Sequence, residues 1–117
     1  MFFSAANQPD PGLLIEELLR WRPKLIVVSG MGAQGCALGI REAIRYFAPV
    51  SLDMPVIDTN GAGDGLAVGF LSSYVLDGFS LEDSIRRGQI AARYTCAQKA
   101  SSAHLIQPDI LQQYFEK

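Results

Sequence analysis

The 117-residue sequence is poor in the residues that mark metal-rich, secreted and nucleic-acid-binding proteins. Its two cysteines, Cys36 and Cys96, show no CxxC spacing, so they predict buried free thiols rather than a disulfide framework or a metal site. Ten Lys and Arg residues against twelve Asp and Glu give a net charge of -2. Such a balance offers no basic surface to nucleic acid or to an anionic membrane, so a small-molecule partner is expected.

The sequence also lacks an apolar run long enough to cross a bilayer. The uncharged stretch from Gly65 to Leu76, for example, has only 12 residues and includes serines. No basic segment precedes the apolar residues at the amino terminus, so a signal peptide is not predicted and a cytoplasmic location is expected. With 49% hydrophobic and 19% charged residues, the composition is typical of a globular protein, and one domain over residues 1–117 is expected.

The first half of the sequence predicts a helix followed by a buried strand. Asp10 and Pro11 are typical of a helix N-cap and first turn, and residues 13–21 have amphipathic helical spacing that ends before Pro23. The β-branched run at 25–28 predicts a strand buried on both faces. A helix followed by a buried strand is typical of an α/β fold.

The middle of the sequence leaves one choice open. Residues 39–47 fit either a weak helix or a turn that leads into a strand at 46–50. Residues 56–57 then predict a strand, which a glycine-rich loop connects to a helix that ends at Asp77-Gly78.

Two more helices are predicted towards the carboxyl end. Ser80 and Asp83 resemble a capping box, and the helix that follows presents one apolar face as far as Cys96. Pro108 opens a short final helix. Three arginines of the longer helix, Arg86, Arg87 and Arg93, are expected to form a solvated face. Two aromatic residues elsewhere in the chain, Trp21 and Tyr74, are expected to be core anchors.

The loop between the predicted strand and helix carries the clearest chemical signal, Asp58-Thr59-Asn60-Gly61-Ala62-Gly63-Asp64. Two glycines separated by a small residue let successive N–H groups point the same way, and the helix start adds its positive dipole end. This arrangement predicts an anion site. Asp64 would then serve as a base beside a bound phosphate, although a carboxylate also stabilises the first turn of any helix.

This seven-residue string resembles the DTxGAGD signature of the ribokinase-like carbohydrate kinases, the PfkB family, and residues 65–70 resemble its continuation. The resemblance implies the carboxy-terminal part of a ribokinase-like three-layer α/β/α fold. It also implies ATP-dependent phosphotransfer to a hydroxyl of a sugar or nucleoside. The implied catalytic base is Asp64, and the implied anion hole is formed by Gly61, Ala62 and Gly63.

The same resemblance implies a nucleotide site and cofactors. The strand at 25–28 and the turn after it resemble the family's strand and GxxG turn. Gln89 falls where the family commonly has an Asn beside the adenine. The loop at 99–102 resembles the family's loop that closes the adenine pocket. The implied nucleotide-binding residues are Gly32, Gly35, Gln89 and Ser101. Asp58 and Asn60 match a monovalent-cation site, so ATP with Mg2+, and also K+, are the implied cofactors.

The sequence departs from the family pattern at several places. Asn60 replaces the more usual Thr, and Gly65 stands where Ala, Ser or Thr is usual, which together with Gly69 we expect to allow close packing against the sheet. The family's amino-terminal sugar site and its NxxE motif for magnesium are not in the sequence. The acceptor therefore cannot be identified, and catalysis by this chain alone is not expected. A second copy could cover an exposed sheet edge and form a homodimer.

Two alternatives remain open. The chain could be a catalytically silent nucleotide-binding or oligomeric remnant. It could also be a Rossmann NAD-binding module, because Gly30 to Gly35 is a GxGxxG string after a strand, with Asp53 18 residues further on. The Rossmann alternative requires a helix from about Gln34 to Phe47.

Overall fold

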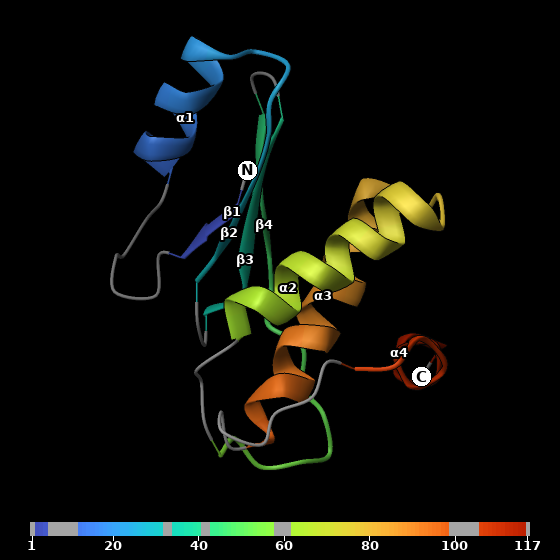
Figure 1. The fold of residues 1–117 in the computed structure, drawn as a ribbon. Helices are drawn as coiled ribbons and strands as arrows, with labels where there is room; N and C mark the ends of the chain where they lie inside the picture. The colour runs from blue at the N-terminus through green and yellow to red at the C-terminus, as the bar shows by residue number, and fades with distance from the viewer. Residues whose placement is uncertain are drawn as a thin grey trace. The chain divides into compact units, whose positions relative to one another are not determined.

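The computed structural model of the chain divides into two compact units, each described by itself (Figure 1). The amino-terminal unit is Met1–Pro49 and the carboxy-terminal unit is Val50–Lys117. The structure describes residues 2–4, 12–31, 34–40, 43–57, 62–98 and 106–116. The expectation of one domain over the whole chain stays a prediction.

The amino-terminal unit consists of a four-stranded sheet and one helix. Its elements are β1 (Phe2–Ser4), α1 (Gly12–Trp21), β2 (Ile26–Gly30), β3 (Cys36–Ile40) and β4 (Ala43–Phe47). The strands lie in the order β1-β2-β3-β4, with β1 parallel to β2 and the other neighbouring pairs antiparallel. The predicted helix at 13–21 and strand at 25–28 are confirmed, while Asp10 and Pro11 lie outside the described residues.

The β3–β4 hairpin settles the choice that the sequence left open. Its register pairs Cys36 with Phe47 and Ile40 with Ala43. The helical interpretation of 39–47 is therefore wrong, and the strand lies at 43–47 rather than at 46–50. Pairing across the sheet decides this stretch, because its local propensities are weak. The Rossmann alternative is also wrong, since it required a helix where β3 and β4 lie.

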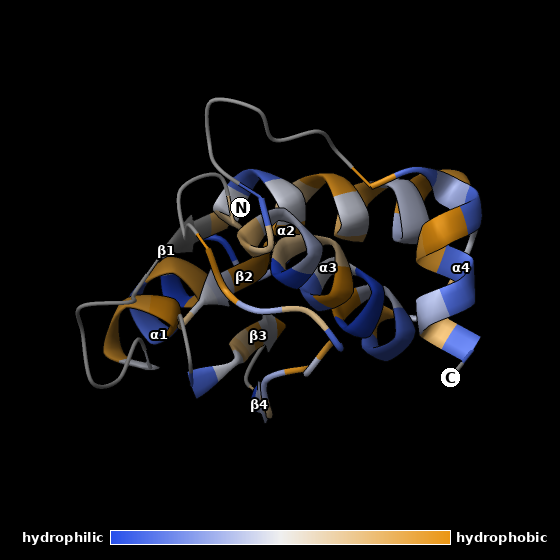
Figure 2. Ribbon diagram, turned by 90° about the horizontal axis from the view of Figure 1, so that it is seen from below, coloured by the Kyte–Doolittle hydropathy of each residue, from blue (hydrophilic) through white to orange (hydrophobic). Residues whose placement is uncertain are grey.

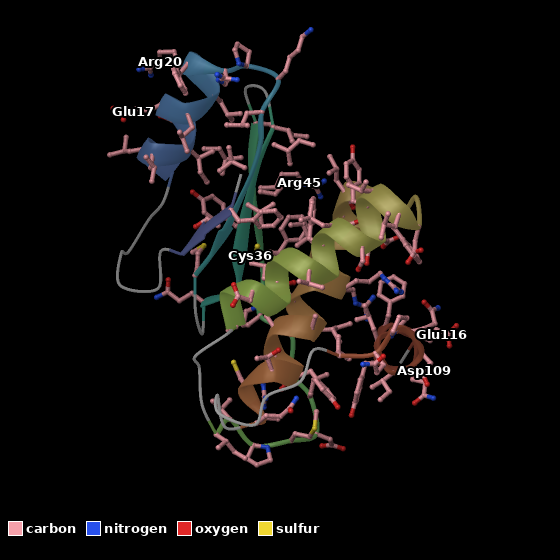
Figure 3. All side chains as sticks on the ribbon, viewed as in Figure 1. Glu17, Arg20, Cys36, Arg45, Asp109 and Glu116 are labelled. Atoms are coloured by element: carbon pink, nitrogen blue, oxygen red, sulfur yellow. The ribbon has the colours of Figure 1, made fainter. Side chains whose placement is uncertain are left out.

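The core of the amino-terminal unit lies between α1 and the sheet. Ile15 and Leu19 of α1 pack against Val27 and Ala37. Charged residues lie on the side of α1 away from the sheet, as Glu17 and Arg20 do in Figure 3, and α1 is accordingly two-coloured in Figure 2. Trp21, at the end of α1, is 72% exposed, so the expectation of a core anchor there is wrong.

The carboxy-terminal unit is helical. Its elements are α2 (Ala62–Leu71), the π-helix η2 (Ser72–Leu76) that continues it, α3 (Leu81–Cys96) and α4 (Pro108–Glu116). The predicted cap of α3 is confirmed, because the Asp83 amide donates to Ser80 Oγ at 3.1 Å. The strand expected at 56–57 is wrong, since residues 50–57 contain no strand. None of the helices in the described ranges combines the length and apolarity that a membrane span needs.

Arg87 fixes α4 on the rest of this unit. Arg87 is only 3% exposed; its Nε donates to Ser73 Oγ at 2.8 Å and its Nη1 to Gln112 Oε1 at 2.5 Å. It also lies 4.3 Å from the centroid of the Phe79 ring. Burial lowers the pKa of Arg87, whereas the charges of two nearby carboxylates, Asp77 and Asp83, act to raise it. The expected solvated face is therefore wrong at this position, because Arg87 is an internal cross-link between η2, α3 and α4.

Candidate functional site

The candidate site lies at the start of α2, where the glycine loop leads into the helix. Ala62, Gly63 and Asp64 open α2, and the Asp64 side chain is exposed. The first N–H groups of an α-helix have no partner within the helix, and the helix dipole places partial positive charge there. A side chain added at Gly63 would meet no atom of the described residues within 4 Å. The first turn therefore offers amide donors and a carboxylate on an open side.

The rotation of α2 is fixed by a seam of small residues against α3. A Cβ at Gly65 would lie 2.9 Å from Thr95 Oγ1 and 3.0 Å from the Ala91 carbonyl oxygen. A Cβ at Gly69 would lie 2.8 Å from Ala91 Cβ and 2.9 Å from Gly88 Cα. The sequence predicts packing of Gly65 and Gly69 against the sheet; the close partner that the structure shows is α3. This seam buries one side of α2.

The seam also determines which side Asp64 occupies. Gly65 is buried against α3, and Asp64, its chain neighbour, is exposed. Successive helical residues are rotated by about 100° around the axis, at 3.6 residues per turn. Because Gly65 must face α3, Asp64 is turned away from the closest line of contact and its carboxylate is accessible.

The chain just before the signature is attached to the end of α3. The Ile57 amide donates to the Cys96 carbonyl oxygen at 2.7 Å, and Arg93 Nη2 donates to the Met54 carbonyl oxygen. Ile57 directly precedes Asp58, the first residue of the signature. Both flanks of the segment 58–61 therefore contact the last turns of α3. The expectation of a solvated Arg93 is wrong in this respect, since its guanidinium binds backbone.

The predicted nucleotide residues fall into two groups. Gln89 lies on α3 and is buried at 8% exposure. Gly35 lies between β2 and β3 with a φ of +104°, and a Cβ there would overlap the Phe47 carbonyl oxygen, so only glycine fits this turn. The remaining predicted site residues lie outside the described residues: Gly32, Asp58, Asn60, Gly61 and Ser101.

Sequence reasoning missed the residues that support the site from α3. Thr95 contacts the position next to Asp64, its hydroxyl donating to the Ala91 carbonyl oxygen at 3.0 Å, and Arg93 binds the chain before the loop. The spacing of Gly65 and Gly69, one helical turn apart, was the available signal for a close helix contact. No comparable signal marks Arg93, because its partner is a backbone carbonyl 39 residues away.

The described part of the chain contains no cluster of metal ligands. Nowhere in it do three His, Cys, Asp or Glu side chains gather as a ligand set. The two residues predicted for a monovalent cation, Asp58 and Asn60, lie outside it. ATP, Mg2+ and K+ therefore stay predictions. The two predicted free thiols, Cys36 and Cys96, are confirmed as free and buried.

Comparison with known proteins identifies the family. A family model described as pfkB family carbohydrate kinase matches residues 6–108. The chain is 36% identical over 109 residues to an acarbose 7(IV)-phosphotransferase from Actinoplanes sp., which covers 91% of this chain and 36% of that protein. A further match, 58% identical, covers 33 residues of a 2-dehydro-3-deoxygluconokinase from Bacillus subtilis, which is 28% of this chain and 10% of that protein.

Solved structures agree with the predicted fold. A microbiome-derived acarbose kinase matches with a TM-score of 0.84 and 26% identity, over 99% of this chain and 40% of its own. The nucleoside kinase of Methanocaldococcus jannaschii, at 24% identity, matches with a TM-score of 0.78 over 98% of this chain and 38% of its own. The predicted α/β, ribokinase-like fold class is confirmed, and the chain spans well under half the length of these relatives. Because the family model covers most of the sequence, the chain belongs to the pfkB family of carbohydrate kinases.

Proposed function

We propose that this chain supplies the catalytic base and the anion-binding helix start for ATP-dependent phosphotransfer to a hydroxyl of a sugar or nucleoside. The observation that carries the proposal is the position of Asp64, exposed in the first turn of α2 next to the glycine that packs on α3. Membership of a family of carbohydrate kinases supports the reaction type.

Asp64 has a defined role in the proposed reaction. Its carboxylate accepts the proton of the acceptor hydroxyl as that oxygen attacks the γ-phosphate of ATP, and the β–γ bridging oxygen leaves with ADP. The amides of Gly61, Ala62 and Gly63 donate to the oxygens of the transferring phosphoryl group, and the positive end of the α2 dipole adds to this stabilisation. Most of the catalysis in this scheme is positioning and electrostatics, which is usual for phosphoryl transfer.

The acceptor class is proposed from the relatives. Two of them are named for acarbose, one for 2-dehydro-3-deoxygluconate and one for nucleosides. Acarbose is therefore the first acceptor to test, followed by simple sugars and nucleosides. The chain covers only 36% of the acarbose phosphotransferase, so the proposal concerns the part of the reaction that these residues perform.

The test combines calorimetry of ATP binding with a phosphotransfer assay over this acceptor panel, each with Mg2+ and K+. In a complete enzyme, since catalysis by this chain alone is not expected, Asp64→Asn should leave the Kd for ATP within about twofold and reduce turnover by about 10²–10⁴-fold, the usual contribution of a general base. Asp109→Asn is the matched control, because Asp109 is also an exposed aspartate in the first turn of a helix, α4 (Figure 3). It should behave like the unsubstituted chain. Near-normal turnover of Asp64→Asn would remove Asp64 from the role.

The second candidate function is a nucleotide-binding remnant without turnover. The chain spans 36% of the acarbose phosphotransferase and 40% of the acarbose kinase. ATP binding with no phosphotransfer to any acceptor even in a complete enzyme, with and without Asp109→Asn, would support this alternative against the kinase proposal.

A further inference from the structure

The segment that leads into the signature leaves its last two side chains largely exposed. Residues 54–57 contain no helix or strand, and Val56 and Ile57 are 56% and 54% exposed. Apolar side chains that remain in water contribute little to fixing the backbone that carries them. Hydrogen bonds therefore contribute to the position of this segment beside the partly buried Met54.

Two hydrogen bonds tie the segment to one side of α3. The Ile57 amide donates to the Cys96 carbonyl oxygen at 2.7 Å, and Arg93 Nη2 donates to the Met54 carbonyl oxygen. Arg93 and Cys96 are three residues apart, so they are neighbours on the helix surface. The Arg93 bond involves a charged donor, which makes it the stronger type of the two.

Arg93 is partly buried where it binds the Met54 carbonyl oxygen. Its Nη1 is buried and has no hydrogen-bond partner among the described residues. A buried donor without an acceptor is unfavourable, whereas a solvated guanidinium satisfies all its N–H groups with water. Within the described part of the chain, the guanidinium therefore has the Met54 carbonyl oxygen as its hydrogen-bond acceptor.

The other flank of the signature rests on the same part of α3. Gly65 approaches Thr95 and Ala91, and Asp64 directly precedes it. Residues 91–96 therefore contact the chain both before and after the segment 58–61. Loss of either contact would move one end of the segment 58–61 relative to its other end.

We infer that Arg93 is a positioning residue for Asp64: through Met54 it fixes the chain that enters the signature, while the same part of α3 holds the start of α2 through Gly65. Arg93 does not contact the reacting groups in this scheme. The inference rests on the proposed role of Asp64 for its functional consequence, while the attachment itself is independent of that role.

The first experiment measures residue-resolved amide hydrogen exchange of the chain without nucleotide. Arg93→Met should accelerate exchange of the Ile57 amide by about tenfold or more, since a hydrogen bond to a charged group at the same segment is lost. The Leu111 amide, which donates to the Gln107 carbonyl oxygen at the start of α4, should keep its rate. Arg93→Lys, which retains a charged donor, should restore part of the protection. Arg86→Met is the matched control, because Arg86 is an exposed arginine of the same helix, and it should leave Ile57 unchanged.

Two results would overturn the inference. One is an unchanged exchange rate of Ile57 in Arg93→Met. The other is equal acceleration of Ile57 and Leu111, which would indicate a general loss of stability. The amide resonances of Gly63 and Asp64 provide the link to the site, and they should shift in Arg93→Met and return towards their original positions in Arg93→Lys. If Ile57 and these resonances respond as expected while Asp64→Asn retains turnover, the attachment stands and the proposed role of Asp64 fails.

Discussion

The seam between α2 and α3 predicts opposite effects for the same substitution at two glycines of one helix. Gly63 and Gly69 both lie in α2, and both would gain a methyl group on replacement by alanine. At Gly69 the new Cβ would lie 2.8 Å from Ala91 Cβ, 2.9 Å from Gly88 Cα and 3.1 Å from the Arg87 carbonyl oxygen. At Gly63 it would meet no described atom within 4 Å.

The magnitude follows from these distances. Non-bonded carbon atoms prefer a separation of about 3.5–4.0 Å, so α2 and α3 would have to separate by about 0.7 Å to relieve a 2.8 Å contact. All three atoms at Gly69 belong to the backbone or are a Cβ, so no flexible side chain can move aside. Overpacking of this kind costs about 1–3 kcal/mol, and the better helix propensity of alanine returns about 1 kcal/mol. We expect Gly69→Ala to destabilise the chain by up to about 2 kcal/mol. Gly63→Ala should stabilise it by about 0.5–1 kcal/mol.

Urea unfolding followed by circular dichroism at the helical signal measures both effects. With a slope of about 1–3 kcal/mol per molar urea, the two midpoints should differ by about 1 M, with the unsubstituted chain between them. The slope itself should not change, because neither substitution alters the surface exposed on unfolding. A Gly69→Ala midpoint equal to or above that of the unsubstituted chain would mean that α2 and α3 are not in this close contact.

Two further predictions concern buried groups. Arg87→Met should destabilise the chain by about 2–4 kcal/mol in the same urea assay, because two hydrogen bonds of a buried charged donor are lost. Arg86→Met should cost less than about 1 kcal/mol. Similar losses of stability in both variants would contradict the role of Arg87 as a cross-link. Burial raises the pKa of Cys36 to about 12 from the ordinary 9.0, so the folded state keeps the thiol protonated where the unfolded chain ionises. The contribution of the protonated thiol to the free energy of unfolding is therefore full below pH 9 and is lost as the pH rises towards about 12. Cys36→Ala should remove that part of the pH dependence of stability. An unchanged pH dependence of the free energy of unfolding in Cys36→Ala would refute the prediction.

The helices could be predicted from sequence where local signals and burial agree. At α3 the Ser80 cap and the apolar spacing through Ile85 to Cys96 mark the same element, and the structure has it at those residues. At β4 the local signals were weak, and partners in β3 decide the conformation. Sheet pairing joins residues that no short window of sequence compares, so Ala43–Phe47 could not be assigned in advance.

The prediction at Val56 and Ile57 was wrong for a related reason. β-branched residues favour extended backbone, but a strand also needs a neighbour to pair with. In the structure the Ile57 amide instead donates to the end of a helix, at Cys96, and both side chains remain exposed. Arg87 was predicted to be exposed and is buried, because the burial of an arginine depends on distant acceptors such as Ser73. Trp21 was predicted to be buried and is exposed, because the exposure of a tryptophan at a helix end depends on what packs beside it.

Gly65 shows how the motif and its surroundings depend on one another. Judged from the helix alone, glycine at this position costs about 1 kcal/mol relative to alanine. In the structure a Cβ would lie within about 3 Å of Thr95 and Ala91, so any side chain at 65 would push the start of α2 away from α3. Asp64 would move with it. Proton transfer requires the base within hydrogen-bond reach of the acceptor hydroxyl, and small displacements of a reacting group reduce rates strongly. The residue that looks like a departure from the family signature is therefore the one that this chain needs, given Thr95 on α3, to keep the proposed base in place.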